Sequence, residues 1–567
     1  MKTIFLMLVG TISNISYGWN PPANHGGVAG GGSGNNGEMM STKASNCTPT
    51  TERKFMDYND LRVLIETGGI MWQDRLLNRG SYFAPRPPAN VSNGPSVLYA
   101  GALWMGGTDV NGQLKLAGML FASRGRDYWT GPLTVNLNTG NFNPIEPIIG
   151  GSNVVRPFGE ATITAQTCIQ YDRFFTVSKA MVREFIRWWE CNDDPSISGC
   201  DNSVSVSAQT LNVILNWPAH GDESLGQDRY LAPFYDRNKN GIYDPIEGGD
   251  YPWYDFDDEV DCRNDRRVTL FGDETHWWVF NDRGNIHGET GGDPIGMEVR
   301  AQAFSFATND EVNQMTFYNY EMINRGTQTL FNTYFAQFAD PDIGGSEDDY
   351  VGCDVARGLG YAMNGDDYDQ TLGAAIGYLD RPPAVGIDFF EGPYQDDDGK
   401  DNVGPAFNEN GVLIVPSVAA ARADMGIVYS GLGIGYSDGV VDNERYGMKR
   451  FVYFNRAGTG GAVPGVNDDP VNAVDFYRYM RGIWRNNERM GYGGFAHSLA
   501  PGIVPGVESD YMFPGTSDPL GWGTPGSPPQ APWSEFTINN PPGDRRFVQA
   551  AGPFTLRPGS INNITVG

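Results

Sequence analysis

The sequence predicts a mainly β protein, with a multi-domain β-sandwich architecture, long Asp/Gly-rich loops and a small helical insertion. Short runs of aromatic and β-branched residues recur along the chain, separated by Gly, Pro, Asn and Asp, a pattern typical of strands and turns. The 74 glycines and 37 prolines among 567 residues suit many tight turns. Helical periodicity is confined to a few short segments. These observations together favour β-sandwiches.

The N-terminus has the pattern of a secretory signal peptide. Lys2 precedes an apolar run over residues 4–9, and Ser16 and Gly18 place small residues where a signal peptidase needs them. The glycine-rich stretch that follows predicts a flexible linker. The expected order is signal peptide 1–18, linker 19–50, N-terminal β domain 51–165, helical insertion 166–265, and a large β-sandwich domain 266–567. We expect this last domain to continue beyond the chain, because residues 560–567 look like a strand without a closing turn.

Several segments can be assigned to strands or helices. Residues 297–306 alternate apolar and polar side chains, as a strand with one solvent-exposed face does. Apolar side chains at three- and four-residue spacing predict a helix over residues 179–190. Further strands are expected at 97–104, 276–280 and 315–323, and further helices at 59–66 and 473–489.

The charge balance narrows the range of partners. Acidic residues outnumber basic ones by 68 to 40, which gives a net charge of −28. Nucleic acids and anionic membrane surfaces both require basic patches, so we expect neither as a partner. No stretch after the signal peptide approaches about 18 uninterrupted apolar residues, which predicts no membrane insertion. Bound divalent cations would offset part of the repulsion between the many acids in Asp-rich turns.

Six cysteines in an exported chain predict disulfide bonds. Cys191 and Cys200 bracket a short loop and are expected to form one bond. No Cys or His spacing typical of a zinc site is present. The other four cysteines can pair in three ways, all of which stay open: Cys47, Cys168, Cys262 and Cys353.

Residues 236–247 fill every position of a twelve-residue calcium loop. Gly241 stands at position 6, where the chain must turn sharply, and Glu247 at position 12 supplies a bidentate carboxylate. Calcium needs six to eight oxygen ligands at flexible distances, which one tight loop can supply. We therefore predict Ca²⁺ as the bound ion; the alternative is an acidic surface turn. The remaining predicted ligands are Asp236, Asn238, Asn240, the carbonyl of Ile242, and Asp244.

The flanks of this loop predict a structural site rather than a sensor. A calcium sensor needs a helix on each side of the loop, whose relative angle changes on binding. Pro233, Gly248, Gly249 and Pro252 disfavour helices on both sides. Extracellular modules of this kind bind calcium at ~10⁻⁴–10⁻³ M. Millimolar calcium would then add on the order of 1–2 kcal/mol to folding.

Two further acidic turns are candidate calcium sites. Residues 340–349 and residues 438–444 each place several carboxylates around a glycine, although neither matches a fixed ligand pattern. A charged surface turn is the alternative for both. The candidate ligands are Asp340, Asp342, Asp348, Asp349, Asp438, Asp442 and Glu444.

No catalytic motif stands out, so we expect a protein without enzymatic activity. Residues 435–439 match the G-x-S-x-G pattern, but Ser437 lies in a glycine-rich run without the buried strand and the helix that a nucleophile elbow requires. A pair of glycosidase carboxylates stays open, because their partners are not visible from the sequence. The tryptophan pairs at 188–189 and 277–278 suit either sugar stacking or buried packing.

A resemblance to a known family is carried by segments 69–72, 100–107, 127–133, 217–221, the calcium loop 236–247 with 249–252, 277–282, 340–344 with 348–354, 438–445, 543–546 and 552–556. Together these segments resemble a family of large exported proteins of Bacteroidota that end in a type IX secretion sorting domain. The resemblance spans nearly the whole mature chain and implies export to the outer cell surface or beyond. It brings no catalytic residues, and the sorting domain itself is absent from these 567 residues.

These observations lead to three functional hypotheses. The first is a calcium-stabilised secreted or cell-surface protein with a structural or adhesin-like role, whose partners are calcium, surface glycans or other surface proteins. The second is a carbohydrate-binding or carbohydrate-active surface protein. The third is a subunit of an extracellular filament or surface layer, which would expose a large apolar patch or open sheet edges.

Overall fold

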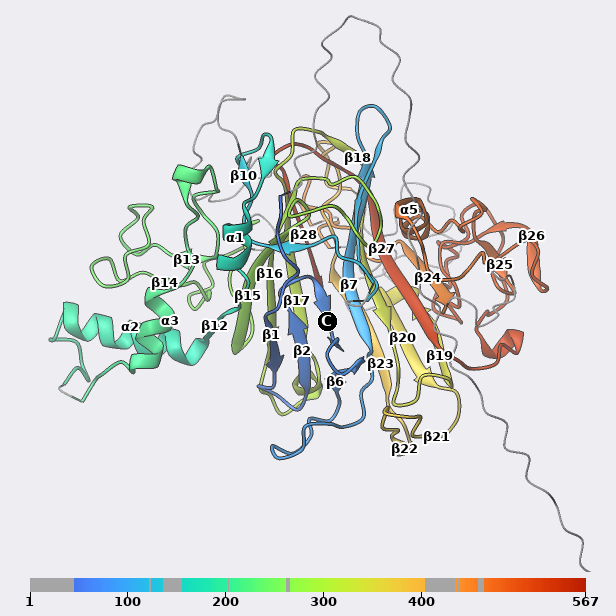
Figure 1. Ribbon diagram of the computed structural model, residues 1–567, viewed down its shortest axis with the longest axis horizontal. Coiled ribbons are helices and arrows are strands. Elements are labelled where there is room, and N and C mark those ends of the chain that lie inside the picture. Colours follow the sequence, from blue (N-terminus) through green and yellow to red (C-terminus); the bar gives the residue numbers. More distant parts are fainter. Residues whose placement is uncertain are drawn as a thin grey trace, which may run out of the picture. The chain divides into compact units, whose positions relative to one another are not determined.

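Two nine-stranded antiparallel sheets dominate the computed structural model of the protein, and most of their strands are labelled in Figure 1. The predicted mainly β fold is therefore confirmed, with only a few helices. The structure describes residues 45–121, 124–135, 156–201, 203–261, 266–402, 434–436, 438–456, 463 and 465–567.

The first sheet has the strand order β1-β2-β3-β7-β18-β27-β24, with β6 beside β2 and β8 beside β7. β7 lies between β3 and β18, so strands that are distant in the sequence share this sheet. Its members are β1 (Arg53–Met56), β2 (Arg62–Glu66), β3 (Ile70–Met71), β6 (Tyr82–Phe83), β7 (Ala100–Thr108), β8 (Leu114–Ala117), β18 (Leu330–Asp340), β24 (Arg450–Asn455) and β27 (Arg545–Leu556).

The second sheet has the order β12-β15-β16-β17-β28-β23-β20-β19, with β9 beside β15. The last strand, β28, is central and separates β17 from β23. Its members are β9 (Trp129–Thr130), β12 (Phe175–Ser178), β15 (Glu274–Asn281), β16 (Met297–Ser305), β17 (Phe317–Asn324), β19 (Asp349–Asp354), β20 (Leu359–Asn364), β23 (Ala384–Glu391) and β28 (Ile561–Val566).

The two sheets pack face to face around one large core. Trp72, from the first sheet's side, donates its indole N–H to the hydroxyl of Tyr318 in β17 (2.9 Å). The buried hydroxyl of Tyr320 lies 2.9 Å from the sulfur of Met71 in β3. Each fully buried aromatic or aliphatic side chain of this kind stabilises the fold by about 1.5–3 kcal/mol. The aromatic runs of the sequence therefore fill the space between the sheets.

A helical segment packs on β12 and β15 at one end of the second sheet, and it lies on the left in Figure 1. It contains α1 (Ala165–Gln170), α2 (Lys179–Asp193) and α3 (Ala208–Leu215). A second core joins it to β15, because Trp277 and Val279 point toward the helices while Trp278 and Phe280 point into the sandwich. The period-two alternation of a strand thus connects the two cores.

The predicted helices have three different outcomes. The helix expected at 179–190 is confirmed as α2. The helix expected at 473–489 is shorter, α5 (Ala473–Met480), and the following turn uses Gly482 with a φ of +67°. The helix expected at 59–66 is wrong: residues 62–66 form β2, antiparallel to β1. Pairing with β1 and burial of the Val63 and Ile65 side chains override the local helical spacing.

The sequence predicted one solvent-exposed face for the strand at residues 297–306, and this prediction is wrong for β16. All nine residues of β16 are buried. Arg300 donates to Glu298 (3.0 Å) and to Asp228 (2.7 Å), which lies in the segment that covers this face. The polar side chains alternate as the sequence predicts, but they pair with one another instead of with water.

Short ribbons and turns complete the fold. α5, β25 and β26 lie on the right in Figure 1.

Among the described residues, no helix is both long and apolar enough to cross a bilayer. The two-stranded ribbons are β4 (Gln73–Asp74) with β5 (Arg79–Gly80), β10 (Thr134–Val135) with β11 (Ala161–Thr162), β13 (Phe234–Tyr235) with β14 (Tyr251–Pro252), β21 (Tyr368–Asp369) with β22 (Leu379–Asp380), and β25 (Gly491–Gly493) with β26 (Ile503–Glu508).

Two disulfide bonds staple the described residues. The predicted bond between Cys191 and Cys200 is confirmed, at the C-terminal end of α2. Cys47 pairs with Cys168 of α1, which decides one of the pairings that the sequence left open. Cys353 is a buried free thiol, and Cys262 lies outside the described residues.

Candidate metal centres

The predicted calcium loop is closed at its base by a two-stranded ribbon. β13 pairs with β14, which places Tyr235 opposite Tyr251, and their rings stack with centroids 5.0 Å apart. The expectation that no helix flanks the loop is confirmed, because residues 231–254 contain no helix. The loop is therefore a fixed turn without the helix pair that a sensor moves.

The first half of the loop folds around the carboxylate of Asp236. One of its oxygens accepts a hydrogen bond from the backbone N–H of Asn240 (3.1 Å), and the other from that of Gly241 (2.6 Å). Gly241 has a φ of +73°, in the left-handed region that favours glycine. Position 6 of the loop thus has the conformation that the sequence pattern requires.

The other side chains of the loop converge on Asp244. Asn238 donates to one oxygen of this carboxylate (3.5 Å) and Asn240 to the other (3.3 Å). A methyl group on Gly248 would lie 1.8 Å from Asp244 Oδ1, so the absence of a side chain there leaves room for the carboxylate. The side chains at positions 3 and 5 thus meet the carboxylate at position 9 through their amide nitrogens, whereas the carboxylate at position 1 accepts backbone N–H groups.

The side chains of the two other predicted ligand residues are exposed. The side chain of Ile242 is 52% exposed, and only its carbonyl is a candidate ligand. The Glu247 side chain is exposed. The carboxylate oxygens of Asp236, Asp244 and Glu247 do not all lie within 4.8 Å of one another. The side chain at position 12 therefore has to turn inward for calcium to gain its bidentate ligand.

Two residues that the sequence analysis missed support the loop. Asp250 is fully buried, and its two oxygens accept hydrogen bonds from the backbone N–H groups of Arg237 and Asp244 (2.9 Å each). Burial, with a contribution from Asp244, raises the pKa of Asp250 to about 6. His220 accepts the N–H of Tyr243 (2.9 Å). Asp250 follows the loop directly in the sequence, so its acidic side chain could have been recognised as a supporting residue. His220 is distant in the sequence, and no local pattern connects it with the loop.

Helix α2 packs directly against the end of the loop. Trp189 donates its indole N–H to the carbonyl of Ile246 (2.9 Å), and its ring fills the space where a side chain at Gly249 would lie. The guanidinium of Arg237 lies 4.8 Å from the same ring and 3.5 Å from the carboxylate of Glu190. The loop is thus joined to the helical segment by packing and charge.

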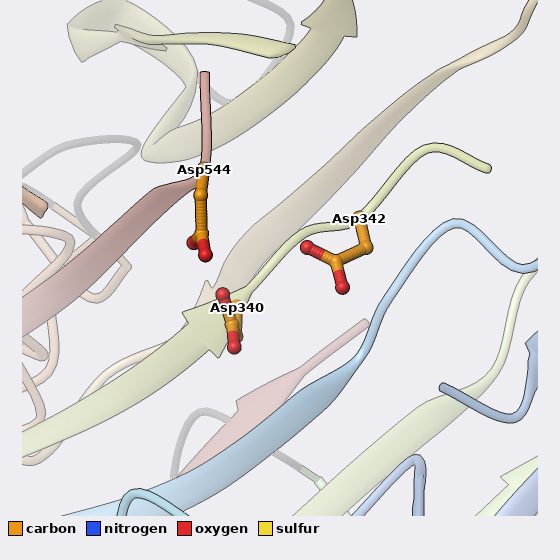
Figure 2. Close-up of side chains that lie close together, drawn as sticks. All are labelled: Asp340, Asp342 and Asp544. Atoms are coloured by element: carbon orange, nitrogen blue, oxygen red, sulfur yellow. The ribbon is translucent and has the colours of Figure 1, made fainter. Parts of the chain in front are cut away.

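A second candidate centre lies at the end of β18 (Figure 2). Asp340, Asp342 and Asp544 each present one carboxylate oxygen, and these three oxygens lie within 4.8 Å of one another. Asp340 ends β18, Asp342 follows in the next loop, and Asp544 directly precedes β27, which pairs with β18. Pairing of the two strands therefore places Asp544 beside residues far away in the sequence.

Burial makes this cluster electrostatically unfavourable without a counter-charge. Desolvation raises the pKa of Asp340 and of Asp342 well above the ordinary value, and it also raises that of Asp544. Arg546 opposes this effect, since it lies 3.2 Å from Asp340 and 3.3 Å from Asp544. It also pairs with Asp469 (2.9 Å), so one guanidinium serves several carboxylates. A bound proton or cation would relieve the excess negative charge.

The remaining candidates of this turn lie apart from the cluster. Asp349 is buried and accepts the N–H of Ile343 (3.1 Å). Burial and the neighbouring Asp369 raise the pKa of Asp348 to about 6. Of the four predicted ligands in this segment, the structure joins Asp340 and Asp342, and it adds Asp544, which the sequence analysis did not single out.

The third predicted site folds against a neighbouring acidic turn. Asp442 accepts the backbone N–H groups of Asp398 (2.7 Å) and Gly399 (2.9 Å), and Glu444 accepts that of Asn402. Asp438 accepts the N–H of Val440 (2.9 Å). In this region the carboxylates cap backbone N–H groups of tight turns, which is a sufficient structural role without a metal.

The described residues include one arrangement that resembles a catalytic relay. His276 lies 2.9 Å from the hydroxyl of Thr176 and 3.3 Å from the carboxylate of Glu274. The imidazole is only 1% exposed, burial lowers its pKa, and Phe174 packs near its ring. A substrate has no access to this ring, so the arrangement is a polar link between β12 and β15. Ser437 lies outside the described residues.

The tryptophan pairs give no support to sugar stacking. Trp277 and Trp278 are 2% and 0% exposed and belong to the two cores. Trp188 and Trp189 are half-buried against the second core. One hollow, of about 450 Å³, lies between Asp60 and residues 308–314 and contains none of the predicted site residues.

Comparisons with known proteins give no match. No protein-family model, no curated protein and no solved structure matches the chain. The case for a function therefore depends on the sites described above.

Proposed function

We propose that the protein is a calcium-stabilised secreted or cell-surface protein with a structural or adhesin-like role, in which the loop at 236–247 binds Ca²⁺. The observation that carries this proposal is a tight turn whose sixth residue is a left-handed glycine, in which Asn238 and Asn240 meet Asp244 and Asp236 folds back on the backbone of residues 240 and 241. Hard oxygen donors on one tight turn are the ligands that calcium prefers.

The proposed location is the outer cell surface or the medium, reached by a signal peptide and type IX secretion. Two disulfide bonds support an oxidising compartment, where such bonds form and persist. The resemblance to exported proteins of Bacteroidota supports the export route, and fractionation of the producing cells would test it. Protein confined to the cytoplasm would contradict the proposed location.

Calcium-dependent unfolding tests the proposed ion. We expect 2 mM calcium to raise the melting temperature relative to chelator, by an amount that corresponds to about 1–2 kcal/mol. Asp236→Ala and Glu247→Ala should each abolish most of this rise, because each removes an oxygen ligand of the loop.

Magnesium serves as the control ion, because it demands a tighter octahedron than this loop offers. Equal melting curves of the parent protein in calcium and in chelator would refute the proposal. If more than one calcium binds per chain, Asp342→Asn tests whether the Asp340, Asp342 and Asp544 cluster holds the second ion.

A further inference from the structure

His220 lies against the calcium loop with both ring nitrogens engaged. Its Nδ1 lies 2.8 Å from the carbonyl oxygen of Arg229, and its Nε2 lies 2.9 Å from the backbone nitrogen of Tyr243. A carbonyl only accepts, so Nδ1 carries the hydrogen and Nε2 is the acceptor for the N–H of Tyr243. One neutral tautomer therefore satisfies both contacts.

The bond to Tyr243 fixes the orientation of the preceding carbonyl. The N–H of Tyr243 and the C=O of Ile242 belong to one planar trans peptide, so they point in opposite directions. With the N–H directed at the imidazole, the carbonyl points away from it. Ile242 is position 7 of the loop, where a calcium loop uses the backbone carbonyl as its ligand.

The surroundings keep this imidazole in place and neutral. The ring of Phe234 meets it edge-on at 5.1 Å, and that of Tyr230 lies at 5.7 Å. Burial lowers the pKa of His220, which favours the neutral form that the two hydrogen bonds require. The side chain of Ile242 is half-exposed and cannot hold the peptide itself.

We propose that His220 is the positioning residue of the calcium loop, holding the peptide between Ile242 and Tyr243 so that the Ile242 carbonyl is presented to the ion in advance. This inference rests on the proposed calcium function. A ligand that is oriented before binding costs no further ordering when the ion arrives, so affinity rises.

Calorimetric titration of the full chain with calcium tests the role of His220. If the titration shows more than one calcium-binding event, the event that disappears in the Asp236→Ala variant is assigned to the loop. In His220→Asn the amide reaches the position of Nδ1 but not that of Nε2, so the bond to Tyr243 is lost. In His220→Gln an oxygen reaches the position of Nε2 and keeps that bond. We expect Kd to rise about tenfold or more in His220→Asn, as for other residues that orient metal ligands, and about threefold or less in His220→Gln.

Tyr243→Phe is the matched control for lost stability. It removes the buried hydrogen bond from the Tyr243 hydroxyl to the carbonyl of Ile214 (2.8 Å) but leaves the Tyr243 N–H intact. We expect a lower melting temperature with Kd within about twofold of the parent value.

Three outcomes would overturn the inference. A parent-like Kd in His220→Asn would remove the positioning role while leaving the proposed function intact. An equal rise of Kd in Tyr243→Phe would mean that general loss of stability explains the effect. The absence of any component that Asp236→Ala abolishes would overturn the proposed calcium function and this inference together.

Discussion

Two fully buried carboxylates of this protein accept hydrogen bonds from several backbone N–H groups. Asp282 is fully buried and accepts from Ile295 (2.5 Å), Gly296 (2.9 Å) and Met297 (2.7 Å). Asp127, also fully buried, accepts from Gly118 and Glu289. Such bonds stabilise the charged form and let an acidic chain fold without many lysines. An acidic turn alone is therefore a weak predictor of a metal, and a converging ligand set is needed.

Gly248, directly after the calcium loop, provides a steric test. In Gly248→Ala the added methyl would lie 1.8 Å from Asp244 Oδ1 and 2.7 Å from the amide nitrogen of Asn238. Both side chains would have to move, so we expect Kd for calcium to rise about tenfold, with a loss of about 1–3 kcal/mol in stability from overpacking. Gly288→Ala is the control, because its methyl would find ordinary contacts of 3.5 Å or more. Unchanged calcium binding in Gly248→Ala would place the ion elsewhere.

A buried glutamate predicts a pH dependence. Glu289 is 7% exposed, and burial raises its pKa from 4.5 to about 7, against the opposing charge of Arg124 at 3.3 Å. The folded state then binds the proton more tightly than the unfolded state, so this stabilisation is present below pH 4.5 and is lost as the pH rises to 7. The difference in unfolding free energy between the Glu289→Gln variant and the parent protein should therefore shift in favour of the variant by about 1–3 kcal/mol from pH 5 to pH 8.

Urea unfolding of both proteins at the two pH values measures this difference. Glu160→Gln, at an exposed position, is the control and should leave the pH dependence unchanged. A constant offset between the Glu289→Gln variant and the parent would show that ionisation of Glu289 does not limit stability.

At the scale of elements, the two disulfides constrain the chain very differently. Cys47 and Cys168 are 121 residues apart and join the N-terminal segment to α1, whereas Cys191 and Cys200 are 9 residues apart at the end of α2. Loop-closure entropy gives about 5 kcal/mol for the long loop and about 2.5 kcal/mol for the short one.

We therefore expect the Cys47→Ala/Cys168→Ala double variant to lose more stability in denaturant than Cys191→Ala/Cys200→Ala. The second pair serves as the control for the loss of a bond as such. Equal losses, or the reverse order, would show that native-state packing rather than chain entropy sets the contribution of each bond.

The sequence predicts local features well and cannot predict what lies across the fold. Strand alternation, the Gly241 turn and the non-helical flanks depend on neighbouring residues, and the structure confirms them. β16 is buried on both faces because the segment that contains Asp228 packs on its outer face. The alternation of apolar and polar residues therefore predicted a solvent-exposed Arg300, which the structure shows to be buried. Asp544 joins Asp340 only because β27 pairs with β18, and His220 reaches Tyr243 only through the packing of the insertion. Such long-range contacts have no local sequence signal.

Across the whole molecule, calcium should stabilise the helical segment more than the sandwich. The loop contacts α2 through Trp189, and α2 belongs to the second core, which meets the sandwich along β15. Removing calcium should therefore loosen the second core locally, because regions with separate cores open with separate free energies. We expect hydrogen exchange after chelation to increase in α2, α3 and the loop, with β7, β18 and β27 unchanged. In the Asp236→Ala variant, hydrogen exchange should be the same with and without calcium. A uniform increase over both sheets would instead mean that the molecule responds to calcium as one cooperative unit.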